Sequence, residues 1–368
     1  MPFTSSYMVR FLFVIALLFS SCSRKVAPMS YQYSVPESGD WQTSHFKAYD
    51  IDSSGIYQLF NQLNEGGHAI HSILLVVDEK LVIEEYFDEY SRLDRHDLRS
   101  VSKSIRSLLM GIAIDRGFIE SIDDPIYKYL RHPTPQKNMD SRKEQITIRH
   151  LLTMSTGLDC NDWDRHSLGQ EDRIYKKDDW LQYFIDLPMV NDPGAVSHYC
   201  SMGTVLAMEV IAQAANMPID EFANQYLFEP LGIENVGWEH TSQKEISSSA
   251  YRLSMTPRDM AKIGQLVLNG GDWNGRQIVS EVWIEESTSA LTSITGIPYG
   301  LLWWRIPLVE GDQKYELIAA TGNGGQYIMI CPELDMIAVF TGGAYNSEDD
   351  KFPFVIMREI FIHTFKGN

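Results

Sequence analysis

The stretch IHSILLVVDEKLVIEEYF, at residues 70–87, decides the fold of this chain. It holds two aliphatic, largely β-branched runs, Ile73–Val77 and Leu81–Ile83, separated by the polar residues Asp78, Glu79 and Lys80. Apolar β-branched runs favour strands, and a short polar break between them favours a reversal of the chain. The sequence therefore predicts a β-hairpin near the N-terminus.

Two similar runs lie near the other end of the chain. Tyr327–Cys331 and Met336–Thr341 are strand-like, and Pro332–Asp335 between them has the proline and acids that suit a tight turn. Tyr299–Ile306 predicts a third strand in this region.

The middle of the chain has helical rather than strand periodicity. Two sets of apolar residues recur at helical spacing: Ile105, Leu108, Leu109, Ile112 and Ala113, and later Ala207, Val210, Ile211 and Ala214. The order strands, helices, strands predicts an α/β (α+β) fold. We expect one domain at 41–368, with an antiparallel sheet built from both ends, flanking helices and a mainly helical insert at about 118–285.

Composition narrows the class of partner. With 44% hydrophobic and 22% charged residues, the 368-residue chain has the composition of a folded domain. A formal charge of -18 argues against nucleic acid and against anionic lipid headgroups. We expect a small-molecule partner, although an acidic surface that merely keeps the protein dispersed is the simpler explanation of the charge.

The N-terminus is typical of an exported protein. Arg10 precedes the apolar run Phe11–Phe19, which predicts a signal peptide at 1–21. A membrane-spanning helix needs about 20 apolar residues, and this run is roughly half that, so a permanent span is the weaker alternative.

The residues after this run resemble a bacterial lipobox. Two serines precede Cys22, which the resemblance makes the lipidated first residue of a periplasmic or cell-surface lipoprotein, although Phe19 matches only loosely. The polar residues 22–40, with Pro28 and Pro36, predict a tether. The lipid would be the protein's only contact with a membrane.

Three cysteines follow in the mature chain, Cys160, Cys200 and Cys331. An exported protein can form disulfides. The chain has neither a Cys-x-x-Cys pair nor a His-Glu-x-x-His motif, so we predict no metal site and no cofactor.

Ser100-Val101-Ser102-Lys103 stands just before the helical pattern that ends near Gly117. Residues three apart on a first helical turn share one face, so the Lys103 amine can reach the Ser100 hydroxyl. The helix N-terminus also favours negative charge developing at Ser100. A serine needs an adjacent base to act as a nucleophile, and a partly desolvated lysine can be that base.

The motif is weak when taken alone. Ser44-His45-Phe46-Lys47 has the same spacing, but no amphipathic helix follows it. Ser100 could also be a plain N-cap that satisfies backbone N–H groups.

Two later motifs accompany Ser100. Tyr199-Cys200-Ser201 follows Pro193-Gly194 and leads into a helix, and Gly322–Gln326 reads Gly-Asn-Gly-Gly-Gln before a strand. Tyr199 alone could be a buried aromatic residue, and the glycine run alone could be a turn. The chain has no Gly-x-Ser-x-Gly elbow, which argues against an α/β-hydrolase triad.

Together the three motifs resemble those of class C β-lactamases, penicillin-binding proteins, related esterases and 6-aminohexanoate-dimer hydrolases. These proteins have Ser-x-x-Lys, then Tyr-x-Asn or Tyr-x-Ser, then Lys-Thr-Gly or His-x-Gly, in this order. The likeness runs from Trp41 to the C-terminal helix and includes Ile148–Leu158, Phe228–Ile233 and Asp259–Gly271.

The resemblance implies a role for each motif residue. Ser100 would attack a carbonyl carbon while Lys103 and Tyr199 relay the proton. Backbone N–H groups of Ser100 and Gln326 would form the oxyanion hole, worth about 3 kcal/mol per donor. Ser201 would hydrogen-bond Lys103 or the substrate.

The third motif also differs from the family pattern. Asn323, with Gly324 and Gly325, would bind substrate, but Asn323 stands where many relatives have a cationic residue. The missing charge favours neutral esters or amides over β-lactams and D-Ala-D-Ala peptides, unless an arginine such as Arg252 replaces it.

Three other kinds of residue have expected roles. Cys160 and Cys200 follow segments that line the cleft in related folds, which predicts a disulfide between them; two separate thiols are the alternative. His150 and His198 would have packing or supporting roles. Trp303 and Trp304 would lie in the core or in a cleft wall.

The sequence therefore predicts an exported serine hydrolase that forms an acyl-enzyme at Ser100. The substrate would be an ester, an amide, a D-amino-acid peptide or a β-lactam. A binding protein of the same fold without turnover is the alternative, and a purely structural surface protein explains none of the motifs.

Overall fold

The computed structural model of the chain describes residues 31–240 and 250–366. The predicted signal peptide and Cys22 lie outside the described residues, as does 241–249 within the predicted insert. The strands are β1 Ile70–Val77, β2 Lys80–Tyr86, β3 His96–Asp97, β4 Gly237–His240, β5 Ala250–Met255, β6 Asp272–Trp273, β7 Arg276–Gln277, β8 Thr292–Ile294, β9 Ile297–Tyr299, β10 Trp304–Glu310, β11 Gln313–Gly322, β12 Gln326–Cys331 and β13 Met336–Gly342.

The main helices are α2 Ser54–Asn64, α3 Val101–Asp115, α4 Ile148–Leu152, α5 Glu171–Ile174, α6 Trp180–Ile185, α7 Ser201–Ala215, α8 Ile219–Ala223, α9 Pro257–Leu268, α10 Glu281–Thr288, α11 Phe352–Ile356, the π-helical turn η8 Met357–Ile362 and α12 His363–Phe365. A short 3-10 helix, η1 Phe46–Tyr49, precedes α2. No helix among the residues that the structure describes is long and apolar enough to cross a membrane.

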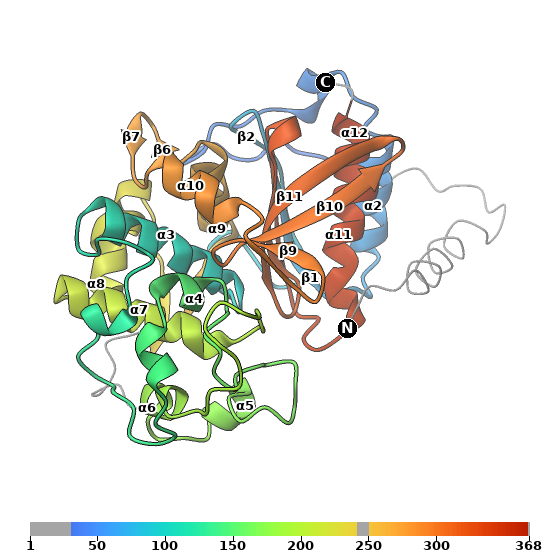
Figure 1. Ribbon diagram of the computed structural model, residues 1–368. Coiled ribbons are helices and arrows are strands. Elements are labelled where there is room, and N and C mark those ends of the chain that lie inside the picture. The colour runs from blue at the N-terminus through green and yellow to red at the C-terminus, as the bar shows by residue number, and fades with distance from the viewer. Residues whose placement is uncertain (1–30, 241–249, 367–368) are drawn as a thin grey trace.

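The two ends of the chain form one antiparallel sheet, in the order β2-β1-β13-β12-β11-β10-β9-β8. The N-terminal hairpin joins the C-terminal strands through β1 and β13, with Ile73 opposite Phe340. In Figure 1 the blue N-terminal strands lie beside the orange-red C-terminal ones. The predicted fold class is confirmed.

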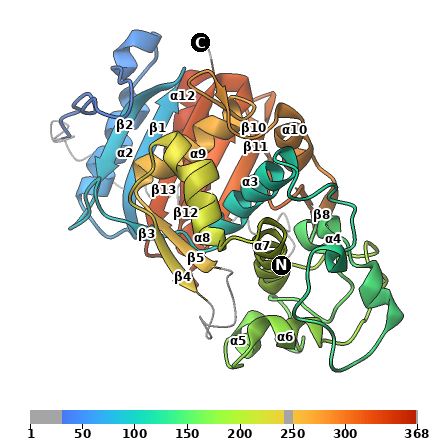
Figure 2. The same cartoon turned by 90° about the vertical axis from the view of Figure 1, so that its left-hand side faces the viewer.

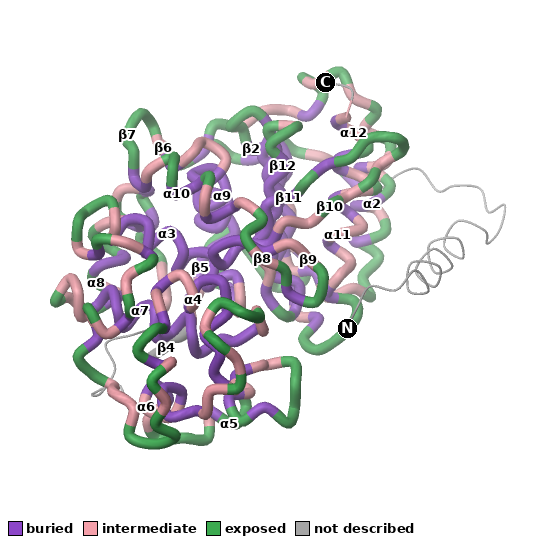
Figure 3. The backbone as a smooth tube through the Cα atoms, in the orientation of Figure 1, coloured by how far each residue is buried: buried purple, intermediate pink, exposed green. Residues whose placement is uncertain are grey.

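Strand β1 is buried on both of its faces. Leu74 and Val76 enter one hydrophobic core, whereas Ile73, Leu75 and Val77 enter a second core on the other side of the sheet. Seven of the eight residues of β1 are buried, and Figure 3 shows β12 of the same sheet buried along its length. A strand covered on both faces needs a continuous apolar run, which is why residues 73–77 show no alternation.

Helices cover both faces of the sheet (Figures 1 and 2). One face packs against α2 and the C-terminal helices, and the other packs against α3, α9 and the helical lobe. Helix α9 lies inside the predicted insert but packs on the sheet. A Cβ at Gly264 would lie 2.7 Å from Ile337 Cγ2, so this glycine lets α9 approach β13 closely. The insert at 118–285 therefore contributes to the sheet layer as well as to the lobe.

The strand predicted at Tyr299–Ile306 is wrong in extent. It is divided into β9 and β10 by a tight turn, in which Gly300 N–H donates to the Trp303 carbonyl and Leu302 has a positive φ of 68°. Strand β10 continues to Glu310 and pairs with β11, an extension that the sequence analysis missed. Its outer half, Pro307–Glu310, alternates between exposed and half-buried residues, and Pro307 interrupts the apolar run, which gives a weaker signal than the buried runs.

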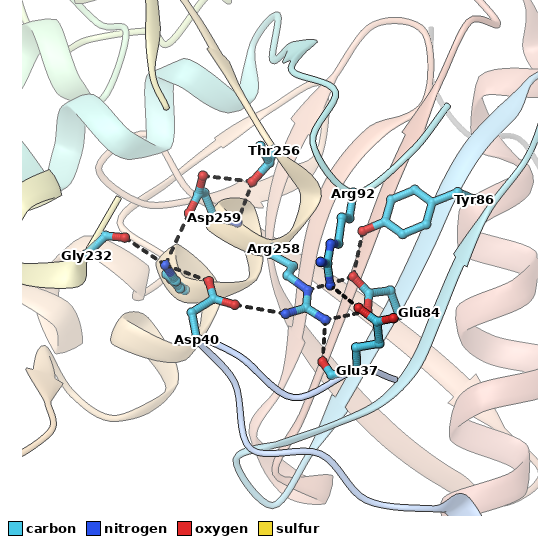
Figure 4. A network of polar contacts seen from close by, with 10 residues as sticks. Glu37, Asp40, Glu84, Tyr86, Arg92, Gly232, Thr256, Arg258 and Asp259 are labelled. Carbon is cyan, nitrogen blue, oxygen red and sulfur yellow. Dashed lines mark hydrogen bonds and ion pairs between the residues drawn. The ribbon is translucent and has the colours of Figure 1, made fainter. Parts of the chain in front are cut away.

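The segment predicted as a tether is folded from residue 31 onward. The Tyr31 ring stacks on Phe60 at 4.9 Å, and its hydroxyl donates to Glu85. Further along, Arg258 of α9 binds Asp40 at 2.9 Å and the Glu37 carbonyl at 2.7 Å (Figure 4). These contacts correct the boundary at 40, because residues 31–40 belong to the domain.

Candidate active site

Ser100 is the residue immediately before α3, a helix buried along most of its length. The Ser100 side chain makes no capping bond to the helix backbone, which removes the plain N-cap alternative. Lys103 is 6% exposed, and its Nζ donates to Ser100 Oγ at 2.9 Å. The predicted pairing of hydroxyl and amine on one helical turn is therefore present.

Tyr199 lies beside this pair at the start of α7. The Lys103 Nζ is 4.9 Å from the centroid of the Tyr199 ring, which is 8% exposed. Helix α7 is held against α3 by a 2.5 Å hydrogen bond from Arg106 to Thr204. Lys103 consequently lies next to both Ser100 and Tyr199.

Two tryptophans lie beside the Tyr199 ring. Trp163 stacks on it with ring centroids 4.8 Å apart and an interplanar angle of 2°, and Trp304 lies at 6.0 Å and 15°. Trp304 is 7% exposed whereas Trp163 is 52% exposed. Trp304 therefore packs beside Tyr199 in the interior, whereas Trp163 stacks on the Tyr199 ring at the protein surface.

Residues 160–163 are bonded to the Tyr199-Cys200-Ser201 motif. Cys160 and Cys200 are joined by a disulfide, as the sequence analysis expected. The Asp162 N–H donates to the Tyr199 carbonyl at 2.8 Å. The backbone of the motif is thus held by a covalent bond and a hydrogen bond from the same segment.

Ser201 is turned toward two acids that the sequence analysis missed. Its hydroxyl donates to Glu171 Oε2 at 3.2 Å, and its N–H donates to Asp162 Oδ2 at 2.7 Å. Of the two partners expected for Ser201, Lys103 is not bonded to it in the described structure, and the substrate stays a prediction. Burial, and then the negative charge of Glu171, raise the pKa of Asp162 to about 6.

The glycine motif is the turn between β11 and β12. A Cβ at Gly322 would lie 2.5 Å from the Leu98 carbonyl, so the turn packs against the segment that leads into Ser100. Gly324 has a φ of 95°, and a Cβ there would meet the Tyr345 ring at 2.5 Å. A residue with a side chain does not fit at position 324 without displacing the Tyr345 ring. Helix α3 also packs against β11 and β12.

Two polar side chains of this turn are already engaged. Asn323 Nδ2 donates to Asn346 Oδ1 at 2.9 Å, and its Oδ1 accepts from Asn346 N at 2.9 Å. The Gln326 amide donates to the Gly342 carbonyl at 2.5 Å inside the sheet. The backbone of Gln326 remains the part that suits the predicted oxyanion role.

The arginines near the site share one carboxylate. Asp97 pairs with Arg99 at 3.2 Å and with Arg252 at 3.4 Å. Arg99 also lies 4.9 Å from the centroid of the Tyr345 ring. The charge of Arg252, considered above as a replacement for a cation at Asn323, is thus balanced in part by Asp97.

The remaining predicted residues have structural contacts. His150 forms a capping box with Thr147 at the start of α4, which is the supporting role expected for it. His198 N–H donates to the Met154 carbonyl. Trp303 is fully buried, as expected for a core residue.

The site residues that were not predicted differ in whether the sequence gives a signal for them. Asp162 and Trp163 lie two and three residues after Cys160, so the predicted disulfide could have drawn attention to them. Glu171 and Tyr345 lie in segments without a recognisable motif, and their approach to the site depends on the tertiary fold.

Comparison with known proteins places the chain in context. Residues 58–355 match the family described as Beta-lactamase. The 6-aminohexanoate-dimer hydrolase of Paenarthrobacter ureafaciens is 23% identical over 289 residues, which are 73% of this chain and 71% of the relative.

Solved structures show the same fold. The octameric penicillin-binding protein homologue from Pyrococcus abyssi has a TM-score of 0.62 at 17% identity, over 83% of this chain and 77% of that one. A hydrolase with promiscuous acyltransferase activity has a TM-score of 0.63 at 15% identity, over 82% and 96% of the two chains.

Proposed function

The chain belongs to the beta-lactamase family of serine hydrolases, and from that premise we propose that it cleaves a neutral carboxylic ester or amide through an acyl-enzyme at Ser100. The observation that carries the proposal is the 2.9 Å contact between Lys103 Nζ and Ser100 Oγ on a buried helical turn. A nucleophile and its base at hydrogen-bonding distance are the geometric signature of covalent catalysis.

The chemistry divides into two steps. Ser100 Oγ attacks the carbonyl carbon and loses its proton to the Lys103 and Tyr199 pair, which passes a proton to the departing alcohol or amine. Water then attacks the acyl-enzyme, gives its proton to the same pair, and Ser100 regains a proton as the acid leaves. Backbone N–H groups of Ser100 and Gln326 would stabilise the oxyanion in both steps.

The substrate class follows from charge at the glycine turn. Asn323 carries no charge, and its amide is committed to Asn346. A carboxylate of a β-lactam or of a terminal D-alanine would lack the charge-assisted bond that a lysine there would give, worth about 1.5 to 3 kcal/mol. The relatives include, by name, a 6-aminohexanoate-dimer hydrolase and a hydrolase with promiscuous acyltransferase activity, which supports acyl hydrolysis but not a particular substrate charge.

We also propose export and anchoring at Cys22. The sequence layout of residues 1–22 supports it, and so does the Cys160–Cys200 disulfide, because disulfides persist in oxidising compartments. Expression of the full chain in a bacterium, followed by membrane fractionation, tests this proposal. Cys22→Ser should release the protein from the membrane, and unchanged membrane retention would contradict the anchor.

A substrate panel tests the enzymatic proposal. The purified domain is offered short-chain chromogenic esters, small amides, D-Ala-D-Ala peptides and a chromogenic cephalosporin, with Ser100→Ala as the control. We expect turnover of neutral substrates in clear excess over the anionic ones. Binding without turnover of any class would favour the non-catalytic alternative, and efficient cephalosporin hydrolysis would contradict the substrate assignment.

A further inference from the structure

Asp162 holds both sides of the Tyr199-Cys200-Ser201 motif. Its backbone N–H donates to the Tyr199 carbonyl at 2.8 Å, and its Oδ2 accepts from the Ser201 N–H at 2.7 Å. Cys200, the N-cap residue of α7, makes no side-chain capping bond. The carboxylate of Asp162 therefore caps this 15-residue helix from another segment, where the helix dipole favours a negative charge.

The second oxygen of the same carboxylate has no such partner. Asp162 Oδ1 is buried, and no hydrogen bond reaches it among the described residues. A buried acceptor without a partner costs about 1 to 3 kcal/mol. Structures keep such groups where another role requires them, and the surroundings of Asp162 indicate what that role is.

Two charged groups from different helices act on Asp162. Glu171, in the short helix α5, is held near it by bonds to Ser201 Oγ at 3.2 Å and to the Tyr175 hydroxyl at 2.8 Å. Lys103, on α3, acts in the opposite sense. Burial and Glu171 raise the pKa of Asp162 to about 6, whereas Lys103 lowers it. Asp162 thus changes charge near pH 6.

We propose that Asp162 is a positioning residue for the catalytic base, which holds the Tyr199 segment by hydrogen bonds and the Lys103 ammonium by charge. This inference rests on the proposed function, because it assigns Lys103 and Tyr199 their catalytic roles. When Asp162 takes up a proton, the negative charge opposite Lys103 and at the start of α7 disappears. Hydrolysis should then slow as the pH falls through about 6.

The pH dependence of kcat/KM on a neutral ester separates positioning from simple packing. The unmodified protein should show an acidic limb near pH 6. Asp162→Asn keeps the shape and an acceptor oxygen but should lose this limb, with a lower plateau. Glu171→Gln removes the neighbouring charge and should move the limb to lower pH. Asp164→Asn, a change of an exposed acid in the same loop, should leave it in place.

The outcomes are distinct. If Asp162 only packs, Asp162→Asn lowers the rate by one factor at every pH and the midpoint of the limb stays where it was. An acidic limb that survives in Asp162→Asn and does not move in Glu171→Gln overturns the inference.

A second measurement does not depend on activity. Carboxyl carbon NMR, with the Asp162 signal assigned through Asp162→Asn, gives the pKa of this group directly. In Lys103→Met it should rise by about one pH unit, the lower end of the effect of a neighbouring opposite charge. An unchanged pKa would show that the two groups are not coupled. This titration decides the inference even if the protein hydrolyses nothing, so its failure is distinguishable from failure of the proposed function.

Discussion

Two segments of this chain contain Ser-x-x-Lys, and only one of them brings its serine and lysine together. At Ser100 an α-helix of 15 residues follows, and Lys103 is buried against the hydroxyl. At Ser44 a four-residue 3-10 helix follows, and Lys47 is exposed. No hydrogen bond joins Ser44 to Lys47 in the described structure.

The difference lies in what the intervening residues do. Phe46 is fully buried, and His45 accepts the Lys47 N–H through its ring, so the chain around Ser44 is organised for packing and for a turn. In the other segment Val101 is buried in the helical core and Ser102 accepts from the Leu253 N–H. The helix that follows the motif, rather than the spacing itself, aligns the lysine with the serine. Each prediction below tests one side of this comparison against the other.

The largest effect is expected from removing the lysine amine. Lys103→Met should lower kcat/KM by roughly 10²- to 10⁴-fold, the usual contribution of a positioned acid or base. Lys47→Met is the matched control and should leave the rate within about twofold, since surface changes are usually small. Steady-state kinetics on the best ester decide it. Equal losses in the two variants would remove the distinction between the segments.

The next largest effect is expected from removing the Cys160–Cys200 disulfide. This bond holds the Tyr199 segment of the Ser100 site and has no counterpart near Ser44. Replacing Cys160 and Cys200 by serine opens a loop of 40 residues and should cost roughly 3 to 4 kcal/mol of unfolding free energy. The urea midpoint measures this. Cys331→Ser, at a buried cysteine outside the disulfide, is the control for cysteine replacement. A midpoint unchanged by the double replacement would contradict a stabilising role for the bond.

His96, four residues before Ser100, is buried, whereas His45, next to Ser44, is more exposed. Burial, and then His71, lower the pKa of His96 to about 4, against about 6.5 in the unfolded chain. The unfolded state therefore takes up the proton first, so stability present above pH 6.5 is lost as the pH falls toward 4. The loss should be roughly 2 to 3 kcal/mol, since each pH unit between the two pKa values contributes about 1.4 kcal/mol.

Chemical denaturation at several pH values between 7 and 4 gives the slope of the unfolding free energy against pH. His96→Asn should flatten it, and His45→Asn should leave it as in the unmodified protein. A slope that is the same in all three proteins would show that His96 is not kept neutral by folding.

The smallest effect concerns substrate charge. Asn323→Lys should shift the ratio of kcat/KM for anionic over neutral substrates by roughly 10- to 100-fold, because 1.4 kcal/mol corresponds to a factor of ten. Gln42→Lys adds the same charge at an exposed position near Ser44 and should not change the ratio. A shift of equal size in both variants would point to net charge and not to the glycine turn.

The fold could be predicted where burial imposes a continuous pattern. The paired runs at 73–83 and 327–341 are buried on both sides, and they indicated the sheet correctly. Strand β10 was missed in part because it is only half-buried, which permits polar residues such as Arg305 and Glu310. The docking of α9 on the sheet depends on contacts of Gly264 with distant residues, which no local pattern records.

The candidate site was predictable only as far as its motifs reach. Ser100, Lys103 and Tyr199 belong to short motifs with known spacing, so they could be named in advance. For Ser201, the expected Lys103 partner was wrong because Glu171, 30 residues earlier, approaches its hydroxyl only in the folded chain. A motif predicts which side chains belong to the site, but tertiary packing decides which residues each of them contacts.

The most direct test of the central claim is a map of covalent labelling by a fluorophosphonate probe. The purified domain is labelled, digested and analysed by mass spectrometry, in parallel with Ser100→Ala and Ser44→Ala. We predict one modified peptide that contains Ser100, loss of labelling in Ser100→Ala, and unchanged labelling in Ser44→Ala. Labelling at Ser44 or Ser102, with none at Ser100, would contradict the account.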